Sequence, residues 1–189
     1  MNWERNPRIR IAAALLRCGE VVAYPTEAVW GLGCDPGNHE AVDRVLAIKG
    51  RAATKGLILI AASPGQLLPY LDELAQDELA RLAEVRAVAT TWVVPASRHA
   101  PPWVTGGRAT IAVRVTRHPL AAALCRVFGG PLVSTSANPQ GKPPARTALK
   151  VRQYFRGAPV HVVPGPLGGA SQPSEIRNLH SGDVLRPGG

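Results

Sequence analysis

Residues 24–35 combine side chains that could do chemistry with a place in the chain where ligands commonly bind. The segment follows an apolar run, residues 21–23, that is typical of the end of a buried strand, and it contains a threonine, a glutamate, two glycines and an aspartate. Open α/β sheets bind ligands where strands end, and glycines help a loop approach a ligand. Taken alone, this turn-rich segment would be an ordinary strand-to-helix loop. Two further polar segments beside apolar runs, residues 49–51 and 134–138, favour a binding site.

Two cations at the end of a predicted helix could bind phosphate. Lys49 and Arg51 are separated by one glycine, and a lysine point charge and an arginine fork can converge on phosphate oxygens. The alternative, and the more ordinary role for an isolated Lys-Gly-Arg, is to complement the partial negative charge of the helix C-terminus. The sequence contains neither GxxxxGK[ST] nor GxGxxG. Side chains would therefore have to hold the phosphates of a nucleotide.

Hydroxyls and an amide follow another predicted strand. The run Ser134-Thr135-Ser136-Ala137-Asn138 offers small neutral groups for a phosphate, a ribose or a hydrated Mg²⁺, and a Ser/Thr-rich turn is an equally good interpretation. Arg114 ends an apolar strand, where its guanidinium is either an ion-pair partner or a clamp for a substrate carboxylate. Ser174 precedes another short strand and by itself indicates little.

No nucleophile with a matching base stands out in the sequence. There is no GxSxG elbow, and Cys18, Cys34 and Cys125 form no CxxC pair and have no evident histidine partner. The five histidines show no HExxH spacing. These features argue against a disulfide scaffold and a zinc site, and reduced thiols favour a cytoplasmic protein. An enzyme built on this sequence would act by positioning its substrates and neutralising their charge.

Composition predicts a globular domain with an anionic partner. The chain has 189 residues, of which 46% are hydrophobic and 5% aromatic, so it can form a core but offers few platforms for base stacking. No apolar run approaches the ~20 residues that cross a bilayer, so we expect no membrane association. Residues 96–189 contain 12 lysines and arginines against two acids, Glu175 and Asp183. This imbalance favours nucleotide phosphates or RNA as partners.

The elements that would position these side chains alternate between helix and strand. Apolar spacing and capping residues predict helices at 8–17, 39–49, near 65–71, 77–84, 119–128 and 147–155. Strands are predicted at 21–24, 57–61, 87–94, 110–114, 131–135, 160–163, 174–179 and 184–185, with a polar loop at 97–108. The continuous apolar run at 57–61 indicates a strand covered on both faces. Together these elements predict one α/β domain.

The ordered set of segments is more specific than any one of them. It comprises residues 24–35, 49–51, 55–60, 112–116 with His118-Pro119, 131–138, 173–177 and 185–186. In this order and spacing the chain resembles the threonylcarbamoyl-AMP synthase family, the YrdC-like proteins of tRNA modification, in its short single-domain bacterial form. Three positions depart from the family pattern: Ala52 stands where proline is usual, residues 87–89 where Pro-Gly-Pro is usual, and Asn178 where aspartate is common.

The resemblance implies a single YrdC-like domain over residues 1–189, with a twisted mixed sheet flanked by helices and a basic concave cleft. It implies that L-threonine, bicarbonate or CO₂, and ATP condense to L-threonylcarbamoyladenylate and pyrophosphate. Mg²⁺ would arrive with ATP, with no metal ligand supplied directly by the protein. Partner proteins would then transfer the threonylcarbamoyl group to adenosine-37 of ANN-decoding tRNAs, giving t6A, and weak RNA binding is expected.

By position, the resemblance assigns threonine binding to Thr26, Arg114 and Ser174. It assigns ATP binding to Lys49, Arg51, Thr110, Ser134, Ser136, Asn138 and Arg186, and it assigns no catalytic residue. A non-catalytic module that binds double-stranded RNA or tRNA is the alternative, and it would need only a distributed basic face. An enzyme needs the polar cluster to converge. A carbamoyl-transferring maturation domain is a third possibility, less favoured because such domains usually belong to much longer chains.

Overall fold

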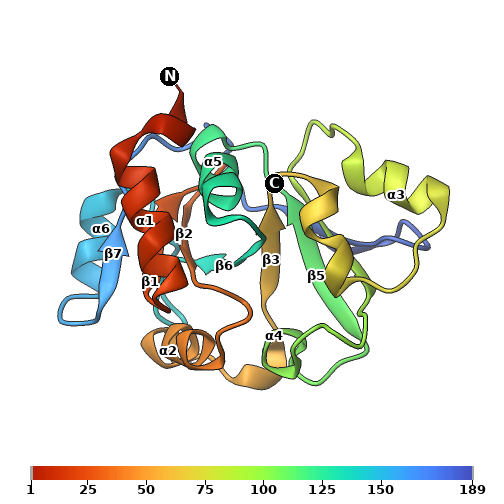
Figure 1. Cartoon of the computed structure of the whole chain (residues 1–189), viewed down its shortest axis with the longest axis horizontal. Coiled ribbons are helices and arrows are strands. Elements are labelled where there is room, and N and C mark those ends of the chain that lie inside the picture. The colour runs from red at the N-terminus through yellow and green to blue at the C-terminus, as the bar shows by residue number, and fades with distance from the viewer. Residues whose placement is uncertain (1, 189) are drawn as a thin grey trace.

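Nine strands form one mixed sheet in the computed structural model, which describes residues 2–188 (Figure 1). The strands are β1 (Val21–Pro25), β2 (Trp30–Gly33), β3 (Ile58–Ala61), β4 (Thr90–Pro95), β5 (Thr110–Val115), β6 (Leu132–Ser136), β7 (Val160–Val162), β8 (Glu175–Asn178) and β9 (Val184–Arg186). Their order is β7-β1-β2-β6-β3-β5-β4-β8-β9. The pairs β1–β7, β3–β5 and β4–β8 are parallel and the others antiparallel, which confirms the predicted mixed α/β fold.

Six α-helices of the described residues flank this sheet. They are α1 (Pro7–Arg17), α2 (His39–Lys49), α3 (Gln76–Ala83), α4 (Pro102–Thr105), α5 (Pro119–Phe128) and α6 (Ala148–Tyr154), with short 3-10 turns η1 (Trp3–Arg5), η2 (Ala53–Lys55), η3 (Pro64–Gln66) and η4 (Leu68–Tyr70). Asn38 caps α2 by accepting a hydrogen bond from the Ala41 amide, and Gly50 ends the helix in the left-handed conformation. Within residues 2–188, none of the helices has the length and apolar character needed to cross a membrane.

Apolar side chains fill both faces of the sheet, as the run at 57–61 predicts. Leu59 packs with Trp30 on one face, whereas Ile60 packs with Tyr24 on the other, beneath α1 and α5. The two helices lie side by side (Figure 1). Leu59 and Ile60 are both fully buried, and each burial contributes about 1.5–3 kcal/mol relative to exposure.

The α1–α5 pair covers only part of its sheet face. Ile58 lies on the same face of β3 as Ile60, because side chains alternate along a strand, yet Ile58 lines an open cavity. On the neighbouring β5, Ala112 and Arg114 also line this cavity, while Val113 between them is buried in the core of the opposite face. One sheet face therefore supplies both a helix-covered core and the wall of a cavity.

Most predicted elements are confirmed, but the turn-rich interpretation of residues 24–35 is wrong in part. Only residues 26–29 form a turn, and the glycine-containing continuation is strand β2, paired with β1 and β6. Its Gly33 allows close packing, since a Cβ there would collide with the Val133 carbonyl oxygen. The predicted helix at 65–71 is two 3-10 turns, the predicted strand at 87–94 starts at Thr90, and the predicted loop at 97–108 contains α4.

Candidate functional site

A cavity of about 490 Å³ opens on the uncovered part of the sheet. Its wall is built from the β1–β2 turn, β5, the end of β6, the η2–β3 connection, the α4–β5 loop and residues 172–174. Pockets of this size bind small molecules, and here segments distant in sequence meet at one place.

The cavity wall is strongly cationic. Five of its residues carry a positive side chain: Arg51, Lys55, Arg108, Arg114 and Arg186. Among the lining residues of the described chain, Glu27 is the one carboxylate. A concave surface with this imbalance concentrates anions, and it suits a ligand with several negative charges.

Arg51 and Arg108 converge on one turn at the edge of the cavity. Arg51 Nη2 donates to the Gly56 carbonyl at 2.9 Å, and Arg108 Nη2 donates to the Thr54 carbonyl at 2.9 Å. Burial, and then the positive charge of Arg108, lower the pKa of Arg51. Guanidinium groups stay charged in proteins, so the wall holds two neighbouring cations whose repulsion a polyanion such as a triphosphate would relieve.

Lys49 and Asn138 lie behind the wall rather than on it. Lys49 is 5% exposed, and its ammonium donates to the carbonyls of Ser136 and, at 2.7 Å, Asn138. Burial, together with the nearby Arg51, lowers the pKa of Lys49 to about 8. The Asn138 amide donates to the Lys142 carbonyl at 2.7 Å. Lys49 is thus bound to the segment that leaves β6 and not to the end of its own helix.

Thr110, Ser134 and Ser136, the hydroxyl residues predicted to bind ATP, line the cavity. Arg186 joins the same wall from β9 and donates to the Ser174 carbonyl at 2.7 Å. This contact connects the groups predicted to bind ATP with a residue predicted to bind threonine.

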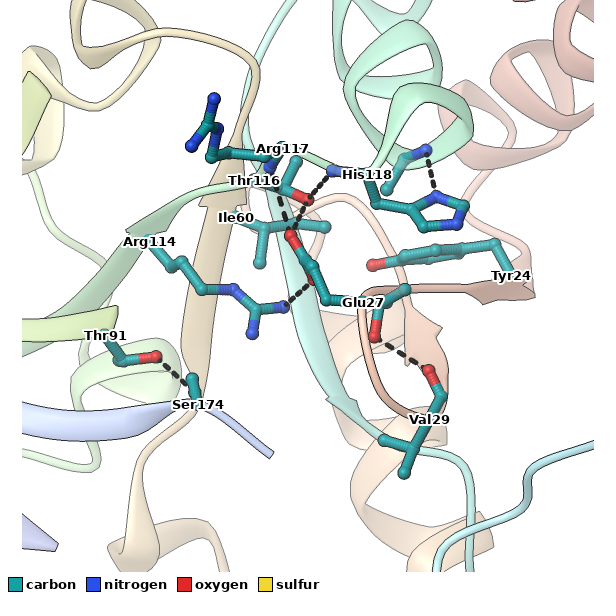
Figure 2. Close-up of polar contacts among 12 residues, drawn as sticks. Tyr24, Glu27, Val29, Ile60, Thr91, Arg114, Thr116, Arg117, His118 and Ser174 are labelled. Atoms are coloured by element: carbon teal, nitrogen blue, oxygen red, sulfur yellow. Dashed lines mark hydrogen bonds and ion pairs between the residues drawn. The ribbon is translucent and has the colours of Figure 1, made fainter. Parts of the chain in front are cut away.

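The three predicted threonine-binding residues, Thr26, Arg114 and Ser174, also line the cavity. Thr26 Oγ1 donates to the Val29 carbonyl at 2.7 Å, so its hydroxyl can only accept a hydrogen bond from a ligand. Ser174 Oγ lies 2.8 Å from Thr91 Oγ1, and both residues are buried. Figure 2 shows the Arg114 side chain, which is 11% exposed, between Ser174 and Glu27.

Glu27 faces Arg114 across the cavity rim (Figure 2). Its Oε2 lies 3.4 Å from Arg114 Nη2, and its Oε1 accepts hydrogen bonds from Thr116 Oγ1 at 2.7 Å and the Arg117 amide at 3.0 Å. Burial raises the pKa of this carboxyl, but Arg114 and the hydrogen bonds outweigh burial, so the net pKa lies below its ordinary value.

The structure therefore brings the predicted site residues together, eight on the wall and two directly behind it. Their binding roles stay predictions. Sequence reasoning did not assign Glu27, Lys55, Thr91 or Arg108. Glu27 stood out as a carboxylate in the segment 24–35 without a role, whereas nothing in the sequence distinguishes Thr91 from other strand residues.

This fold and site define a class: an α/β protein with a basic cavity for a small, multiply charged anionic ligand. The profile of the Sua5/YciO/YrdC family, described as "Telomere recombination", matches residues 14–188. The chain belongs to this family, which confirms the resemblance seen in the sequence motifs.

Relatives and solved structures agree with this assignment. The chain is 51% identical to a threonylcarbamoyl-AMP synthase of Cellvibrio japonicus over 99% of both chains. It is 57% identical to one of Halorhodospira halophila, over 95% of this chain and 94% of the relative. A crystal structure of P. abyssi Sua5 complexed with L-threonine superposes with a TM-score of 0.87 at 35% identity, covering 96% of this chain. The chain spans about half, 54%, of that Sua5 chain.

Proposed function

We propose that the chain is an enzyme that condenses L-threonine, bicarbonate or CO₂, and ATP to L-threonylcarbamoyladenylate and pyrophosphate. The observation that carries this proposal is the composition of the cavity wall, where five cations and several hydroxyls stand against one carboxylate among the described lining residues. The substrates together bring a carboxylate, a carbamate and a triphosphate, so a site with more cations than acids suits them. The names of the full-length relatives support an enzyme over a non-catalytic RNA-binding module.

Threonine would bind through the groups around Arg114. The guanidinium would hold the carboxylate, Thr26 Oγ1 would accept a hydrogen bond from the amino group, and Ser174 would pair with the side-chain hydroxyl. Arg114, Thr26 and Ser174 all line the cavity, and Ser174 is held by Thr91. A solved structure of similar fold, that of P. abyssi Sua5, is complexed with L-threonine, which supports threonine as a substrate.

ATP would bind along the neighbouring part of the wall. Arg51 and Arg186 would contact phosphates, while Thr110, Ser134 and Ser136 would contact phosphate or ribose. Lys49 and Asn138 would fix the end of β6, where Ser136 lies, and the segment that follows it. Mg²⁺ would be carried by the ATP phosphates, as part of the substrate.

The chemistry needs no covalent enzyme intermediate. The threonine nitrogen forms a bond to the carbon of CO₂ and releases a proton, giving a carbamate. A carbamate oxygen then attacks the α-phosphorus of ATP as the bond to the β-phosphate oxygen breaks, so pyrophosphate leaves and the adenylate forms. This is nucleotidyl transfer, in which positioning and charge neutralisation supply the rate enhancement. The product would serve partner proteins that modify adenosine-37 of ANN-decoding tRNAs.

The direct test is pyrophosphate release from ATP, measured with threonine and bicarbonate and with each omitted. Release that requires both supports the proposal, and release that is independent of threonine contradicts it. Serine and valine are the comparators, because a site that pairs with a hydroxyl rejects an isostere without it more strongly than an analogue without a methyl. We expect valine to be a far poorer substrate than serine, and equal turnover of valine and threonine would rule out a hydroxyl-pairing pocket.

A further inference from the structure

Glu27 belongs to no set of residues assigned above, yet it contacts the segments that carry all three proposed threonine-binding residues. It follows Thr26 in the β1–β2 turn, and its carboxylate faces Arg114. Its backbone carbonyl accepts a hydrogen bond at 2.9 Å from Ala170, in the segment that leads to Ser174. Any role of Glu27 in threonine binding rests on the proposed function.

One oxygen of the carboxylate is fixed by the end of β5. Glu27 Oε1 accepts hydrogen bonds from Thr116 Oγ1 and from the Arg117 amide, and Thr116 Oγ1 in turn accepts a hydrogen bond from the His118 amide at 3.2 Å. These contacts hold the carboxylate in one orientation. Thr116 lies two residues after Arg114, so the same strand end carries both the guanidinium and the anchor of its partner.

The second oxygen, Oε2, forms an ion pair with Arg114 and, among residues 2–188, accepts no hydrogen bond. It lies 3.4 Å from Nη2, and both side chains are mostly buried, at 16% and 11% exposure. Within residues 2–188, the Nε of Arg114 is buried without a hydrogen-bond partner. The other terminal nitrogen points away from Glu27, toward the part of the cavity where Ser174 lies (Figure 2). Glu27 therefore holds one edge of the guanidinium and leaves the other edge free for a ligand.

Backbone contacts tie the third segment to the same residue. Besides the bond from Ala170 to the Glu27 carbonyl, Gly168 donates to the Thr26 carbonyl at 3.0 Å. A Cβ at Gly168 would come within 2.9 Å of Glu27 Cα, so this approach requires glycine. Segment 168–170 thus lies directly on the β1–β2 turn before the chain reaches Ser174.

We propose that Glu27 is a positioning residue for threonine, which orients the Arg114 guanidinium toward the substrate carboxylate and joins the three segments that form the threonine subsite. An arginine held in one orientation before binding loses less freedom when a carboxylate arrives. The role belongs to the amino-acid side of the cavity and leaves the ATP side untouched.

The test compares the full chain with Glu27→Gln, measuring the dissociation constants of threonine and ATP by calorimetry and kcat by pyrophosphate release. A glutamine fills the same space but cannot satisfy Thr116, Arg117 and Arg114 together, because one of its two polar atoms is now a donor. We expect the threonine dissociation constant to rise about tenfold, the effect of one misplaced charge-assisted contact. We expect the dissociation constant of ATP to change less than about twofold, because Glu27 contacts none of the residues proposed to bind ATP.

Glu78→Gln is the matched control. Glu78 is also largely buried, at 13% exposure, with one oxygen accepting from the Ala75 amide at 2.9 Å and the other 3.2 Å from His180 Nδ1. It lies outside the cavity wall, so its substitution should leave both dissociation constants unchanged. Should Glu27→Gln fail to fold, Thr116→Val, which removes the hydroxyl anchor but keeps the charge, should weaken threonine binding more than Thr116→Ser.

A double-mutant cycle with Arg114→Met separates positioning from direct contact. If Glu27 acts through Arg114, Glu27→Gln adds no further loss of threonine affinity in the Arg114→Met background. Additive losses would overturn the proposal, because they would mean that Glu27 acts on threonine independently of Arg114. An equal loss of ATP affinity, or an unchanged threonine affinity, would also overturn it. A wild-type chain that binds no threonine would instead overturn the proposed function, and this role with it.

Discussion

Lys49 and Arg51 look equivalent in the sequence but have different surroundings in the structure. Arg51 lines the cavity beside Arg108, where a guanidinium can reach a ligand. Lys49 is buried behind Ser136, and its ammonium donates hydrogen bonds to two backbone carbonyls. Of these two side chains, therefore, Arg51 is the one whose charge lies at the cavity surface. Lys49 instead supports the geometry of the wall.

Replacement of Arg51 by methionine should weaken ATP binding. The loss of one charge-assisted contact costs about 1.5–3 kcal/mol, so we expect the dissociation constant of ATP to rise about 10- to 100-fold. Calorimetric titration of ATP measures this directly. The control is Arg152→Met, because Arg152 is an exposed arginine of α6 that does not line the cavity. Unchanged ATP affinity in Arg51→Met would contradict a phosphate-binding role for Arg51.

The lowered pKa of Glu27 makes a prediction about stability and pH. Its folded-state pKa lies below the ordinary value of 4.5, so the ionised carboxylate stabilises the fold. This contribution is fully present above the unfolded-state pKa and is lost as the pH falls through the folded-state pKa. The difference in unfolding free energy between wild type and Glu27→Gln should therefore be largest above about pH 5 and shrink below it. Urea unfolding at a series of pH values measures it, and a difference independent of pH would contradict the ion pair with Arg114.

At the scale of elements, the sequence pattern predicts those helices and strands whose ends are set by neighbouring residues in the chain. α5 begins and ends at Pro119 and Phe128, as predicted, because a proline starts the helix and Gly129 ends it in the left-handed conformation. Strand β2 is not predicted because its sequence, Trp30–Gly33, is short and half glycine, a residue that is depleted in strands. Its strand geometry comes from pairing with β1 across the turn at 26–29 and with β6, which is distant in the sequence.

The same limit applies to the candidate site. Thr26 and Arg114 stand out in the sequence because one follows and the other ends an apolar run, whereas Ser174 is assigned by the family-like order of the motifs alone. Thr91 does not stand out in this way, because its contact with the cavity site is a hydrogen bond to Ser174, 83 residues away in the chain. The burial of Lys49 could not be predicted either, because the two carbonyls that accept its hydrogen bonds lie at the end of β6 and just after it, far along the chain.

Gly33 gives a prediction at the element scale. A Cβ at this position would collide with the Val133 carbonyl oxygen and lie 2.9 Å from the Tyr24 hydroxyl oxygen, so Gly33→Ala must push β2 away from its neighbours. We expect a loss of about 1–3 kcal/mol in unfolding free energy, the usual cost of overpacking. Gly65→Ala is the matched control, because a Cβ there meets only Ser63 Oγ, at 3.9 Å. Equal stability of the two variants in urea would contradict the close packing of β2.

At the scale of the whole molecule, positive charge extends beyond the cavity. The formal net charge is +9, and residues 96–189 hold 12 of the 22 lysines and arginines but only two of the 13 acids. Several of these cations, including Arg117, Lys142 and Arg156, are exposed and lie off the cavity wall. Such a surface attracts polyanions from a distance, independently of whether the cavity is occupied.

We therefore expect weak binding of tRNA or duplex RNA that depends on phosphate contacts and not on sequence. Binding of this kind releases counterions, so the logarithm of the affinity should fall linearly with the logarithm of the salt concentration, by about 0.7–0.9 per phosphate neutralised. The measurement is RNA affinity at several salt concentrations, with and without saturating ATP. ATP should compete little, because the exposed cations lie outside the site proposed for it. A sequence-selective complex that is insensitive to salt would contradict this electrostatic account, and it would favour RNA recognition over adenylate formation as the main function of the chain.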